Sequence, residues 1–458
     1  MTATETAIQA TALRGYRPYP AYKASGVEWL GEIPKHWDVK RLKNAVKKLE
    51  TGGTPESDNS DFWTDGDDLE GTAWVAISDM TRSFHVRETV KRLTADGLLS
   101  KRLPVLHSGT LLYSMYASLG KVALLEIDAV VNQAILGIVP DTSTVSRDYL
   151  RWWLEFMQGH IQILSSSSTQ ENLNAGKVRN IPVFLPDEAT QQAIANFLDR
   201  ESARIDALVA KKQRLIELLQ EQRIAFITRA VTKGLDPSVP MKDSGVEWLG
   251  EIPEHWEAKR IKWVAKMESG HTPDKKIDAY WRNGIIPWVS LSDTGQLREV
   301  DYIGSTAVFT TPEGIANSSA HLLPSGTVVF SRDATIGLCA ITQGEMAVSQ
   351  HFIGWVCGER IYPEYLLLAL RSMSEELERL TMGATVRTIG MPNVKSLVIP
   401  LPPLQEQQKI VHDAICSRVK IDELLFKVRE AIARLQEFRV ALISSAVTGK
   451  IDVREEVR

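Results

Sequence analysis

The chain has 458 residues, of which 44% are hydrophobic and 24% are charged, and its formal net charge is −4. This composition is typical of a soluble globular protein, and at ~150 residues per domain the length predicts about three folded units. The small negative charge argues against a uniformly basic nucleic-acid-binding protein. It does not exclude a protein that gathers its basic residues on one surface.

Cysteine spacing and hydropathy restrict the environment of the protein. Cys339, Cys357 and Cys416 have no CxxC spacing, which argues against a zinc ribbon or a disulfide framework and favours buried, reduced thiols. No apolar run approaches the ~20 residues that a membrane helix needs. Residues 1–24 lack the charged start and apolar core of a secretory signal. We therefore expect a cytoplasmic protein with no membrane partner and a loosely ordered N-terminal arm over residues 1–24.

One motif occurs twice in the chain. SGVEWLGEIPKHW occupies Ser25–Trp37 and SGVEWLGEIPEHW occupies Ser244–Trp256, with twelve of thirteen positions identical. A long internal repeat of this kind indicates a duplicated architecture. Soon after each copy comes a Thr-Pro loop, TGGTP at Thr51–Pro55 and SGHTP at Ser269–Pro273.

The duplication continues to the end of the chain. Further matched segments, given as first and second copy, are WVAISD (Trp74–Asp79) and WVSLSD (Trp288–Asp293), SGTLLYSMYASLGKVAL (Ser108–Leu124) and SGTVVFSRDATIGLCAI (Ser325–Ile341), VNQAILGIV (Val131–Val139) and VSQHFIGWV (Val348–Val356), and LQEQRIAFITRAVT (Leu219–Thr232) and LQEFRVALISSAVT (Leu435–Thr448). In the last pair each residue corresponds to the one 216 positions later. Between these landmarks the copies differ in sequence and length, so two copies of one scaffold carry different variable surfaces.

Each copy combines a mixed domain with a long helix. The first part has β-rich apolar runs bounded by Gly, Pro and Asp, with one short helical stretch at Tyr149–Met157 or Tyr365–Met373. The segments from Glu188 to about Lys233 and from Leu404 to about Gly449 contain no proline and predict two long helices.

Apolar residues in both helical segments recur at heptad spacing, which predicts helices that wrap around a partner. Because there are two such segments and each follows its own globular part, we expect them to pair as an antiparallel coiled coil with pseudo-twofold symmetry. The alternative is that each helix lies across its own domain. The predicted seam residues are Leu198, Ile205, Leu208, Leu215, Leu219 and Phe226 in the first helix, and Ala414, Ile421, Leu424, Val428, Ala431, Leu435, Phe438 and Leu442 in the second.

Catalytic signatures are absent from the sequence. There is no GxGxxG or GxxxxGK[ST] phosphate-binding loop, and the nine histidines show no HExxH or paired ligand spacing. The Pro402-Pro403 pair lacks the Asn or Asp and the aromatic residue that an amino-methyltransferase loop needs. We predict a chain with no catalytic residue, metal or cofactor of its own.

The repeated elements follow one another in a fixed order. Each copy opens with GVEWLGEIPKHW or its near twin and continues into a variable domain. It then runs through IPVFLPDEATQQAIANFLD (Ile181–Asp199) or IPLPPLQEQQKIV (Ile399–Val411) into its long helix. This arrangement resembles the specificity subunit of Type I restriction–modification enzymes. The resemblance covers nearly the whole chain from about Gly26.

That resemblance implies a mixed α/β (α+β) fold with two target recognition domains, at residues 25–186 and 236–402. In this family each such domain reads half of a bipartite, interrupted DNA sequence. Residues 187–235 would form the first conserved spacer helix, and residues 403–458 the second with a C-terminal tail. The helices would set the gap between the half-sites.

The resemblance also implies partners. These are double-stranded DNA, two modification subunits that bind S-adenosylmethionine and methylate adenine, and separate restriction subunits that translocate and cleave DNA. The modification subunits would dock on the helices, and the repeated signature would mark equivalent docking points. Its tryptophans, Trp29, Trp37, Trp248 and Trp256, are therefore candidate partner contacts.

Three pairs of matched loops contain candidate DNA contacts, because bases are read mainly by polar and basic side chains. Ser165–Lys177 faces Thr381–Lys395, Tyr113–Lys121 faces Phe330–Leu338, and the Thr-Pro loops form the third pair. Plain turn formation is the alternative for any single residue. The candidates are Thr54, Ser114, Tyr116, Lys121, Thr169, Gln170, Asn172, Lys177, Thr272, Arg332, Thr385, Arg387, Thr388 and Lys395.

Differences between matched loops decide among competing functions. Gln170–Asn172 stand where the second copy has Val386–Thr388. Arg387 could pair with guanine, and Gln170 or Asn172 with adenine. This difference favours a non-catalytic DNA-recognition subunit over a duplicated protein-interaction scaffold that reads no sequence. A self-contained methyltransferase, the third alternative, lacks its catalytic loop.

Overall fold

The structure is a computed structural model that describes residues 15–65, 70–116, 118–161, 173–382 and 387–456. Its contacts divide the chain into two compact units, residues 1–212 with 429–458 (unit 1) and residues 213–428 (unit 2). Each unit contains one globular domain and part of both long helices. The sequence had predicted the helices as segments of their own, residues 187–235 and 403–458, each following a domain.

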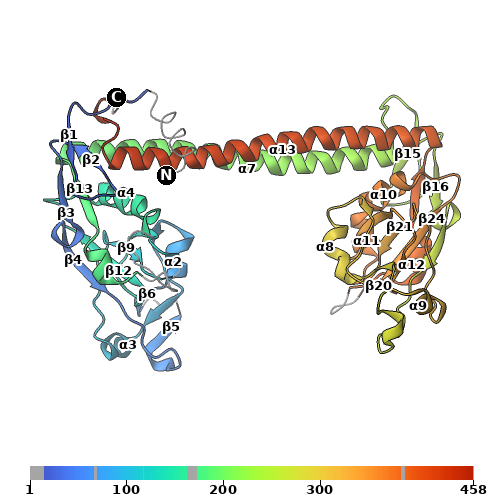
Figure 1. Cartoon of the computed structure of the whole chain (residues 1–458), viewed down its shortest axis with the longest axis horizontal. Helices are drawn as coiled ribbons and strands as arrows, with labels where there is room; N and C mark the ends of the chain where they lie inside the picture. The colour runs from blue at the N-terminus through green and yellow to red at the C-terminus, as the bar shows by residue number, and fades with distance from the viewer. Residues whose placement is uncertain (1–14, 66–69, 117, 162–172, 383–386, 457–458) are drawn as a thin grey trace. The chain divides into compact units, whose positions relative to one another are not determined.

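A five-stranded sheet forms the centre of the domain in unit 1, with strand order β4–β12–β9–β10–β7. Figure 1 labels β4, β12 and β9 of this sheet. Neighbouring strands are antiparallel, except that β10 and β7 are parallel. The strands are β4 (Val46–Thr51), β12 (Ile135–Pro140), β9 (Leu111–Ser114), β10 (Val122–Leu125) and β7 (His85–Val86). Strands β9 and β10 are mostly apolar and buried at every position, as expected for strands covered on both faces.

A second sheet in this domain has the order β11–β6–β8–β5. Side chains of both sheets share one apolar core, to which Val75, Leu112 and Val131 contribute. The remaining elements of the domain are β11 (Ala129–Val131), β6 (Thr72–Val75), β8 (Lys91–Leu93), β5 (Trp63–Asp65), the ribbon of β3 (Asp38–Arg41) and β13 (Pro182–Leu185), and the helices α2 (Ile77–Arg82), α3 (Ala95–Ser100), α4 (Arg147–Gln158) and α6 (Ala175–Arg179).

The domain of unit 2 repeats this architecture. Its sheets have the orders β17–β24–β21–β22–β19 and β20–β18–β23, which match unit 1 strand for strand apart from β5. The elements are β17 (Ala265–Ser269), β24 (Phe352–Cys357), β21 (Val328–Ser331), β22 (Cys339–Thr342), β19 (Tyr302–Ile303), β20 (Phe309–Thr310), β18 (Ile286–Val289), β23 (Ala347–Val348), the ribbon of β16 (Glu257–Arg260) and β25 (Val398–Leu401), and the helices α8 (Thr294–Leu297), α9 (Pro312–Ala316), α10 (Pro363–Ser372), α11 (Ser374–Arg379) and α12 (Met391–Ser396). The duplicated scaffold is confirmed.

The short helix predicted in each copy is confirmed as α4 and α10. The hydroxyl of Ser146 caps α4 by accepting from the amide of Tyr149 at 3.2 Å. The buried hydroxyl of Tyr149 donates to the carbonyl of Phe184 at 2.8 Å, and that of Tyr365 donates to the carbonyl of Pro400 at 2.9 Å. Each bond ties the helix to the ribbon that leads into the long helix.

Both predicted long helices form. α7 spans Glu188–Lys233 and α13 spans Leu404–Val447, so the two helices begin at equivalent positions of the repeat. Near these starts lie Gln191 and Gln407, which are buried. Each glutamine amide bonds to three backbone groups of its own domain or its own helix start. The start of each helix is therefore fixed to the domain before it.

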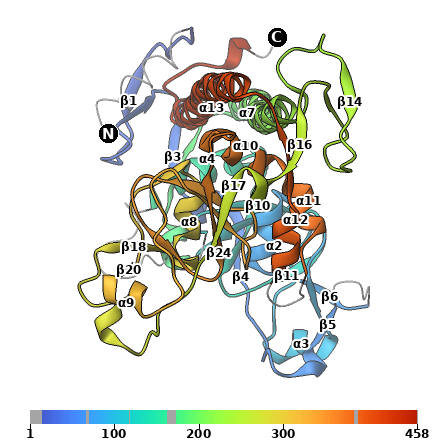
Figure 2. The ribbon, with the colours of Figure 1, turned by 90° about the vertical axis from the view of Figure 1, so that its right-hand side faces the viewer.

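The two helices pair antiparallel in both units. In unit 1, Leu198 near the start of α7 shares an apolar cluster with Leu442 near the end of α13. In unit 2, Leu219 in the later part of α7 packs with Ile421 in the earlier part of α13. The two helices therefore run antiparallel in each unit, as predicted from the two helices following separate domains, and Figure 2 shows α7 and α13 side by side.

Two equivalent ion pairs cross between the helices. The guanidinium of Arg439 lies 3.5 Å from Asp206 in unit 1, and that of Arg223 lies 3.3 Å from Asp422 in unit 2. The two ion pairs are equivalent in the repeat, because Arg223 aligns with Arg439 and Asp206 aligns with Asp422. Such surface pairs add at most about 1 kcal/mol each to the stability of the helix pair. They are therefore more useful as markers of the register between the helices than as a source of stability.

Part of the predicted seam is wrong. Leu208, Leu215 and Leu424 are 40%, 42% and 47% exposed, and the residue after each takes its place, namely Val209, Ile216 and Leu425. With 3.6 residues per turn, the second seam position can lie three or four residues after the first, and spacing alone does not choose. The other predicted seam residues are buried or half-buried: Leu198, Ile205, Leu219, Phe226, Ala414, Ile421, Val428, Ala431, Leu435, Phe438 and Leu442.

The repeated signature supplies the turn and the second strand of a small hairpin in each unit. The hairpins are β1 (Tyr22–Ala24) with β2 (Glu32–Pro34), and β14 (Met241–Asp243) with β15 (Glu251–Pro253). The prediction of a loose arm is wrong for the part described. The amide of Asp452 donates to the carbonyl of Arg17 at 2.7 Å, and Tyr19 is buried. Residues 1–14 lie outside the described residues.

Candidate nucleic-acid interface

The Thr-Pro loops of the two domains make the same contact. Thr54 and Thr272, both predicted to contact DNA, donate hydroxyl hydrogen bonds to the side-chain oxygens of Gln133 and Gln350, respectively. The threonines are half-buried and the glutamines are exposed. The glutamines were missed as candidates, although they stand at the same place in the matched segments VNQAILGIV and VSQHFIGWV.

Two tryptophans hold the Thr54 loop in unit 1. The indole of Trp74 donates to the carbonyl of Gly53 at 3.0 Å, and the indole of Trp63 donates to the carbonyl of Glu56 at 2.9 Å. The two rings pack edge to face with centroids 4.9 Å apart, a favoured aromatic geometry. The loop is therefore tied down on both sides of Thr54.

The Thr272 loop in unit 2 is held in the same way. The indole of Trp288 donates to the carbonyl of His271 at 3.3 Å, and the indole of Trp281 donates to the carbonyl of Asp274 at 3.1 Å. The rings again meet edge to face, with centroids 5.0 Å apart. A constellation of threonine, glutamine and two tryptophans is thus repeated in both domains.

In unit 2 a continuous chain of side chains links all three predicted loops. From Gln350, bonded to Thr272, the side-chain nitrogen lies 3.3 Å from Nε2 of His351. Nδ1 of His351 lies 2.9 Å from the carboxylate of Asp333, which also accepts a hydrogen bond from the hydroxyl of Thr388. Asp333 is buried, so these contacts satisfy a carboxylate that has little access to water.

Unit 1 does not have this chain. Tyr116 stands at the position of Asp333, and Ala134 at the position of His351. The Tyr116 side chain is 42% exposed. The same backbone positions therefore present an aromatic surface in one domain and an acid–imidazole pair in the other, and Tyr116 remains a candidate contact.

The prediction that Ser114 contacts DNA is wrong. Its side chain is fully buried, where its hydroxyl donates to the carbonyl of Ser118 and accepts from the amide of Lys121 at 2.9 Å. Ser331 makes the equivalent contacts in unit 2. These serines close a tight turn, which was the alternative for this loop. The half-buried Lys121 remains a candidate.

The basic candidates lie around these loops. Arg387 has a side chain 48% exposed and pairs with Glu378. Arg332 is more enclosed, with Nε 3.4 Å from the carboxylate of Asp333. Lys177 and Lys395 lie near the ends of the equivalent helices α6 and α12, half-buried and exposed, respectively. The candidates Thr169, Gln170, Asn172 and Thr385 lie outside the described residues.

A cavity opens beside the Thr272 loop in unit 2. Its volume is about 460 Å³, and its lining includes Thr272, Lys275, Trp288, Gln350 and His351. Donors, an imidazole and an aromatic face therefore meet in one hollow. These are side chains that proteins use against DNA bases and phosphates.

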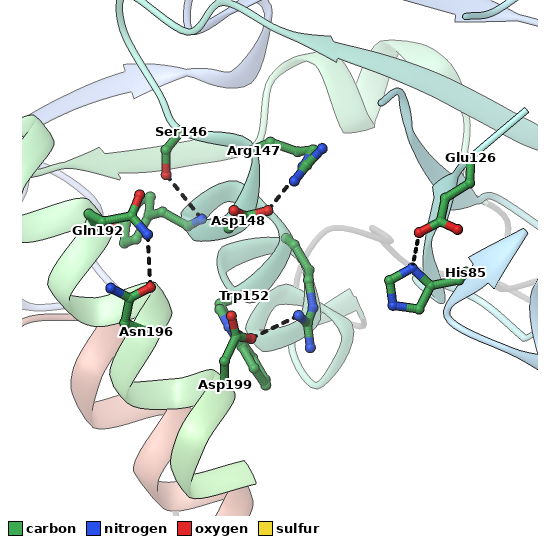
Figure 3. Close-up of polar contacts among 11 residues, drawn as sticks. His85, Glu126, Ser146, Arg147, Asp148, Trp152, Gln192, Asn196 and Asp199 are labelled. Atoms are coloured by element: carbon green, nitrogen blue, oxygen red, sulfur yellow. Dashed lines mark hydrogen bonds and ion pairs between the residues drawn. The ribbon is translucent and has the colours of Figure 1, made fainter. Parts of the chain in front are cut away.

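Away from the loops, α4 packs against α7 in unit 1 through one carboxylate. Asp199 on α7 accepts from the guanidinium of Arg151 at 2.9 Å and from the indole of Trp152 at 3.0 Å. Figure 3 shows the side chains of Trp152 and Asp199 next to each other. The Arg151 guanidinium also lies 4.2 Å from the ring centres of Trp152 and Phe84. Large side chains therefore fill this groove.

The equivalent groove of unit 2 is not filled. Leu367, Leu368 and Ile415 stand at the positions of Arg151, Trp152 and Asp199, and a cavity of about 500 Å³ lies between α10 and the two long helices.

An ion cluster borders that cavity. Asp301 accepts from Arg371 at 2.6 Å and also pairs with Arg418. Burial raises the pKa of Asp301, but its bonds to Arg418 and Arg371 outweigh burial, and the net pKa is lowered. A carboxylate with a lowered pKa stabilises the folded state at neutral pH and loses that contribution only as the pH falls through the lowered value.

The tryptophans predicted to dock partners behave differently. Trp37 and Trp256 are fully buried, so the prediction that they contact a partner directly is wrong. The motif needs them as core residues that hold the hairpin to its unit. Trp29 and Trp248 are half-buried, and Trp29 stacks on His160 with ring centres 5.0 Å apart.

Exposed apolar side chains instead occur at equivalent positions on the helices. Leu208 on α7 and Leu424 on α13 are 40% and 47% exposed, and Ile224 and Val440 are 67% and 66% exposed. Each unit carries one residue of each pair, because Leu208 and Val440 belong to unit 1 and Leu424 and Ile224 to unit 2. Because they are exposed at the same positions in both units, these four residues are candidate contacts for a protein partner.

Among the described residues, metal-binding groups and membrane-spanning helices are both absent. No group of three or more His, Cys, Asp or Glu side chains is placed to hold a metal ion. No described helix is long and apolar enough to cross a membrane.

Comparisons with known proteins agree on one family. The family model for the Type I restriction modification DNA specificity domain matches residues 34–218 and 253–413. The MjaIX specificity subunit of a Type I restriction enzyme from Methanocaldococcus jannaschii is 31% identical over 188 residues, covering 39% of this chain and 43% of that protein. The MjaVIII specificity subunit from the same organism is 23% identical and covers 92% of this chain and 94% of that protein.

A solved structure supports the fold. A chain from work on complex assembly and conformational transition of the type I R-M system superposes with a TM-score of 0.68, at 16% identity, over 92% of this chain and 99% of the other. The mixed α/β fold with two sheet-bearing domains and long helices is therefore confirmed. None of these comparisons supports the alternative of an interaction scaffold that reads no DNA sequence.

Proposed function

The chain belongs to the family of Type I restriction–modification DNA specificity subunits, and we propose that each of its two domains reads one half of a bipartite, interrupted DNA target. Under this proposal the chain supplies recognition and carries no catalytic residue. The paired helices α7 and α13 set the gap between the half-sites and bind the methyltransferase subunits.

One observation carries this function: matched loop positions on one scaffold hold different polar side chains. Asp333, His351 and Thr388 form a hydrogen-bonded group in unit 2, whereas unit 1 has Tyr116 and Ala134 at the first two positions. A pair of purely structural domains would not need to exchange such buried and half-buried polar groups while keeping its sheets. Two readers of different half-sites must do so, because each base pair presents its own pattern of donors and acceptors.

Docking of two modification subunits is supported by the helices more than by the signature. Leu208 and Leu424 are equivalent, exposed and outside the seam. Two copies of one partner would find the same apolar contact on each unit. We propose that S-adenosylmethionine binds to the modification subunits, and that restriction subunits join the same assembly.

The experiment is a map of methylated adenines in cells that contain the modification subunits, with and without this chain. We expect one bipartite motif that is present only with the chain. The chain purified alone and incubated with DNA and S-adenosylmethionine should transfer no methyl groups. Methylation by the chain alone, or a motif that persists without the chain, would contradict the proposed role.

A further inference from the structure

One polar contact is the same in the two domains although the loops around it differ. In each domain a threonine of the Thr-Pro loop donates to a glutamine from the turn before the last strand of the central sheet, Thr54 to Gln133 and Thr272 to Gln350. The glutamines are exposed, so hydrogen bonding to the threonine holds a side chain that would otherwise rotate freely in solvent.

The loop that carries the threonine is rigidly held in both domains. Indole donors of two tryptophans bond to carbonyls on either side of it, Gly53 and Glu56 in unit 1 and His271 and Asp274 in unit 2. Fixing a loop from both sides lowers the entropy that a contact must overcome, which is the advantage of a preorganised site. The loop needs no such support for the turn alone, since Pro55 or Pro273 already restricts the backbone.

The side-chain amide of each glutamine can still act as a hydrogen-bond donor. Its side-chain oxygen already accepts from the threonine hydroxyl, so what remains for a ligand is the amide nitrogen with its two N–H groups. In unit 2 one of them lies toward His351, at 3.3 Å. The partner that fits is therefore a hydrogen-bond acceptor.

Building on the proposed reading of DNA, we propose that the Thr54–Gln133 and Thr272–Gln350 pairs donate to an acceptor that both half-sites have in common. Two domains that read different sequences but keep the same contact should use it to bind a group that both half-sites contain. That is either a backbone phosphate or a base acceptor at a fixed distance from the adenine to be methylated. The pairs place each half-site in the same way on its domain, and the divergent side chains around them read the sequence.

Neighbouring residues support this division of roles. Beside the matched pairs, Lys275 and Lys276 in unit 2 stand where unit 1 has Ser57 and Asp58. The charge near the loop is therefore not preserved between the domains, whereas the threonine, the glutamine and both indole contacts are. What is preserved is the hydrogen-bond geometry.

The test uses the assembled complex with its modification subunits and two isosteric variants, Gln133→Glu and Gln350→Glu. A carboxylate still accepts from the threonine but donates nothing and repels a phosphate, so folding is kept while the contact is lost. We expect each variant to bind target DNA at least about tenfold more weakly, the usual effect of losing a hydrogen bond to a charged group. Gln192→Glu, which makes the same charge change on α7 outside these loops, should bind as the wild type does.

Two readouts distinguish the acceptors. With a phosphate, each variant weakens target and non-target DNA by the same factor and leaves the methylated motif unchanged. With a base, each variant relaxes one motif position, at the same distance from the methylated adenine in both half-sites. Should a variant lose its fold, Gln133→Ala and Gln350→Ala repeat the measurement without added charge.

The inference is overturned if both variants bind like wild type, if only one of them is impaired, or if they alter motif positions that are not equivalent. If instead the wild-type complex showed no preference for any DNA sequence, the proposed function itself would fail.

Discussion

The domains of units 1 and 2 have the same sheets and differ in the polar groups that those sheets present. The strand orders match apart from β5, and the tryptophan-held Thr-Pro loop recurs in both. By contrast, Asp333 with its partners His351 and Thr388 has no equivalent among the described residues of unit 1. Within one chain, the two domains have therefore kept the same sheets while the polar side chains of their loops have changed.

This difference involves several loops at once for a physical reason. A buried carboxylate such as Asp333 is costly unless its oxygens are hydrogen-bonded. His351 and Thr388, which come from two other loops, supply those bonds. Where Tyr116 replaces the carboxylate, Ala134 can replace the histidine without penalty. A change of one side chain in this group thus requires matching changes in the neighbouring loops. We therefore expect substitutions in these loops to alter the preference for several DNA positions together.

The sharpest test of independence between the domains is an exchange. Replacing residues 62–177 with the matching region of a homologue should change one half of the methylated motif entirely and leave the other half intact. Adenine methylation mapping in cells is the measurement. A motif altered in both halves would show that recognition is shared between the domains.

The helices should set the spacing between the two readers. Inserting one heptad into each helix, after Lys212 in α7 and after Val428 in α13, lengthens the pair by ~10 Å because a helix rises ~1.5 Å per residue. The gap in the methylated motif should widen by about three base pairs, at ~3.4 Å per base pair. An unchanged gap would refute the spacer role. As a control, inserting the heptad into α7 alone should destabilise the pair, because it shifts the seam of one helix against the other.

The buried signature tryptophans should matter for folding, unlike their partly exposed neighbours. Trp256 is fully buried, and its indole donates to Glu406 at 3.0 Å. Trp256→Ala should cost about 3–5 kcal/mol of stability, as for other large buried aromatic residues. Chemical denaturation followed by circular dichroism measures this loss. Trp248→Ala, at a half-buried position of the same motif, is the matched control and should cost much less.

The corrected seam predicts opposite results for two adjacent leucines on α13. Leu425 is 5% exposed, whereas Leu424 is 47% exposed. Leu425→Ala should destabilise the chain by about 2–3 kcal/mol, in the lower range for a buried leucine. Leu424→Ala should leave the unfolding midpoint nearly unchanged and weaken binding of the modification subunit. If both variants destabilised the chain equally, Leu424 would belong to the seam, as the heptad spacing had predicted.

Patterns within the sequence predicted the duplication, the short and long helices and their antiparallel pairing, since each depends on periodicity or on repetition. Side-chain partners were harder to predict. Ser114 looked like a polar loop residue but closes a buried turn, and Trp37 looked like a docking residue but lies in the core. The contacts of Gln133 and Gln350 join segments far apart in the chain, and such contacts leave no local pattern. Matched glutamines in a repeat were the one signal available.

The finest difference between the domains is a single exposed arginine. Arg387 extends from the loop that also supplies Thr388, and its side chain is 48% exposed and paired with Glu378. Bidentate pairing of arginine with guanine contributes roughly 1–3 kcal/mol of discrimination. Arg387→Ala should therefore relax one position of the half-site read by unit 2, by about five- to a hundred-fold in relative binding of competing sequences, and leave the other half-site unchanged. Arg379→Ala, at an arginine on α11 that is 59% exposed and paired with Glu376, is the control. If both variants weakened all sequences alike, Arg387 would be a phosphate contact, and base reading by unit 2 would rest on the Asp333–His351–Thr388 group alone.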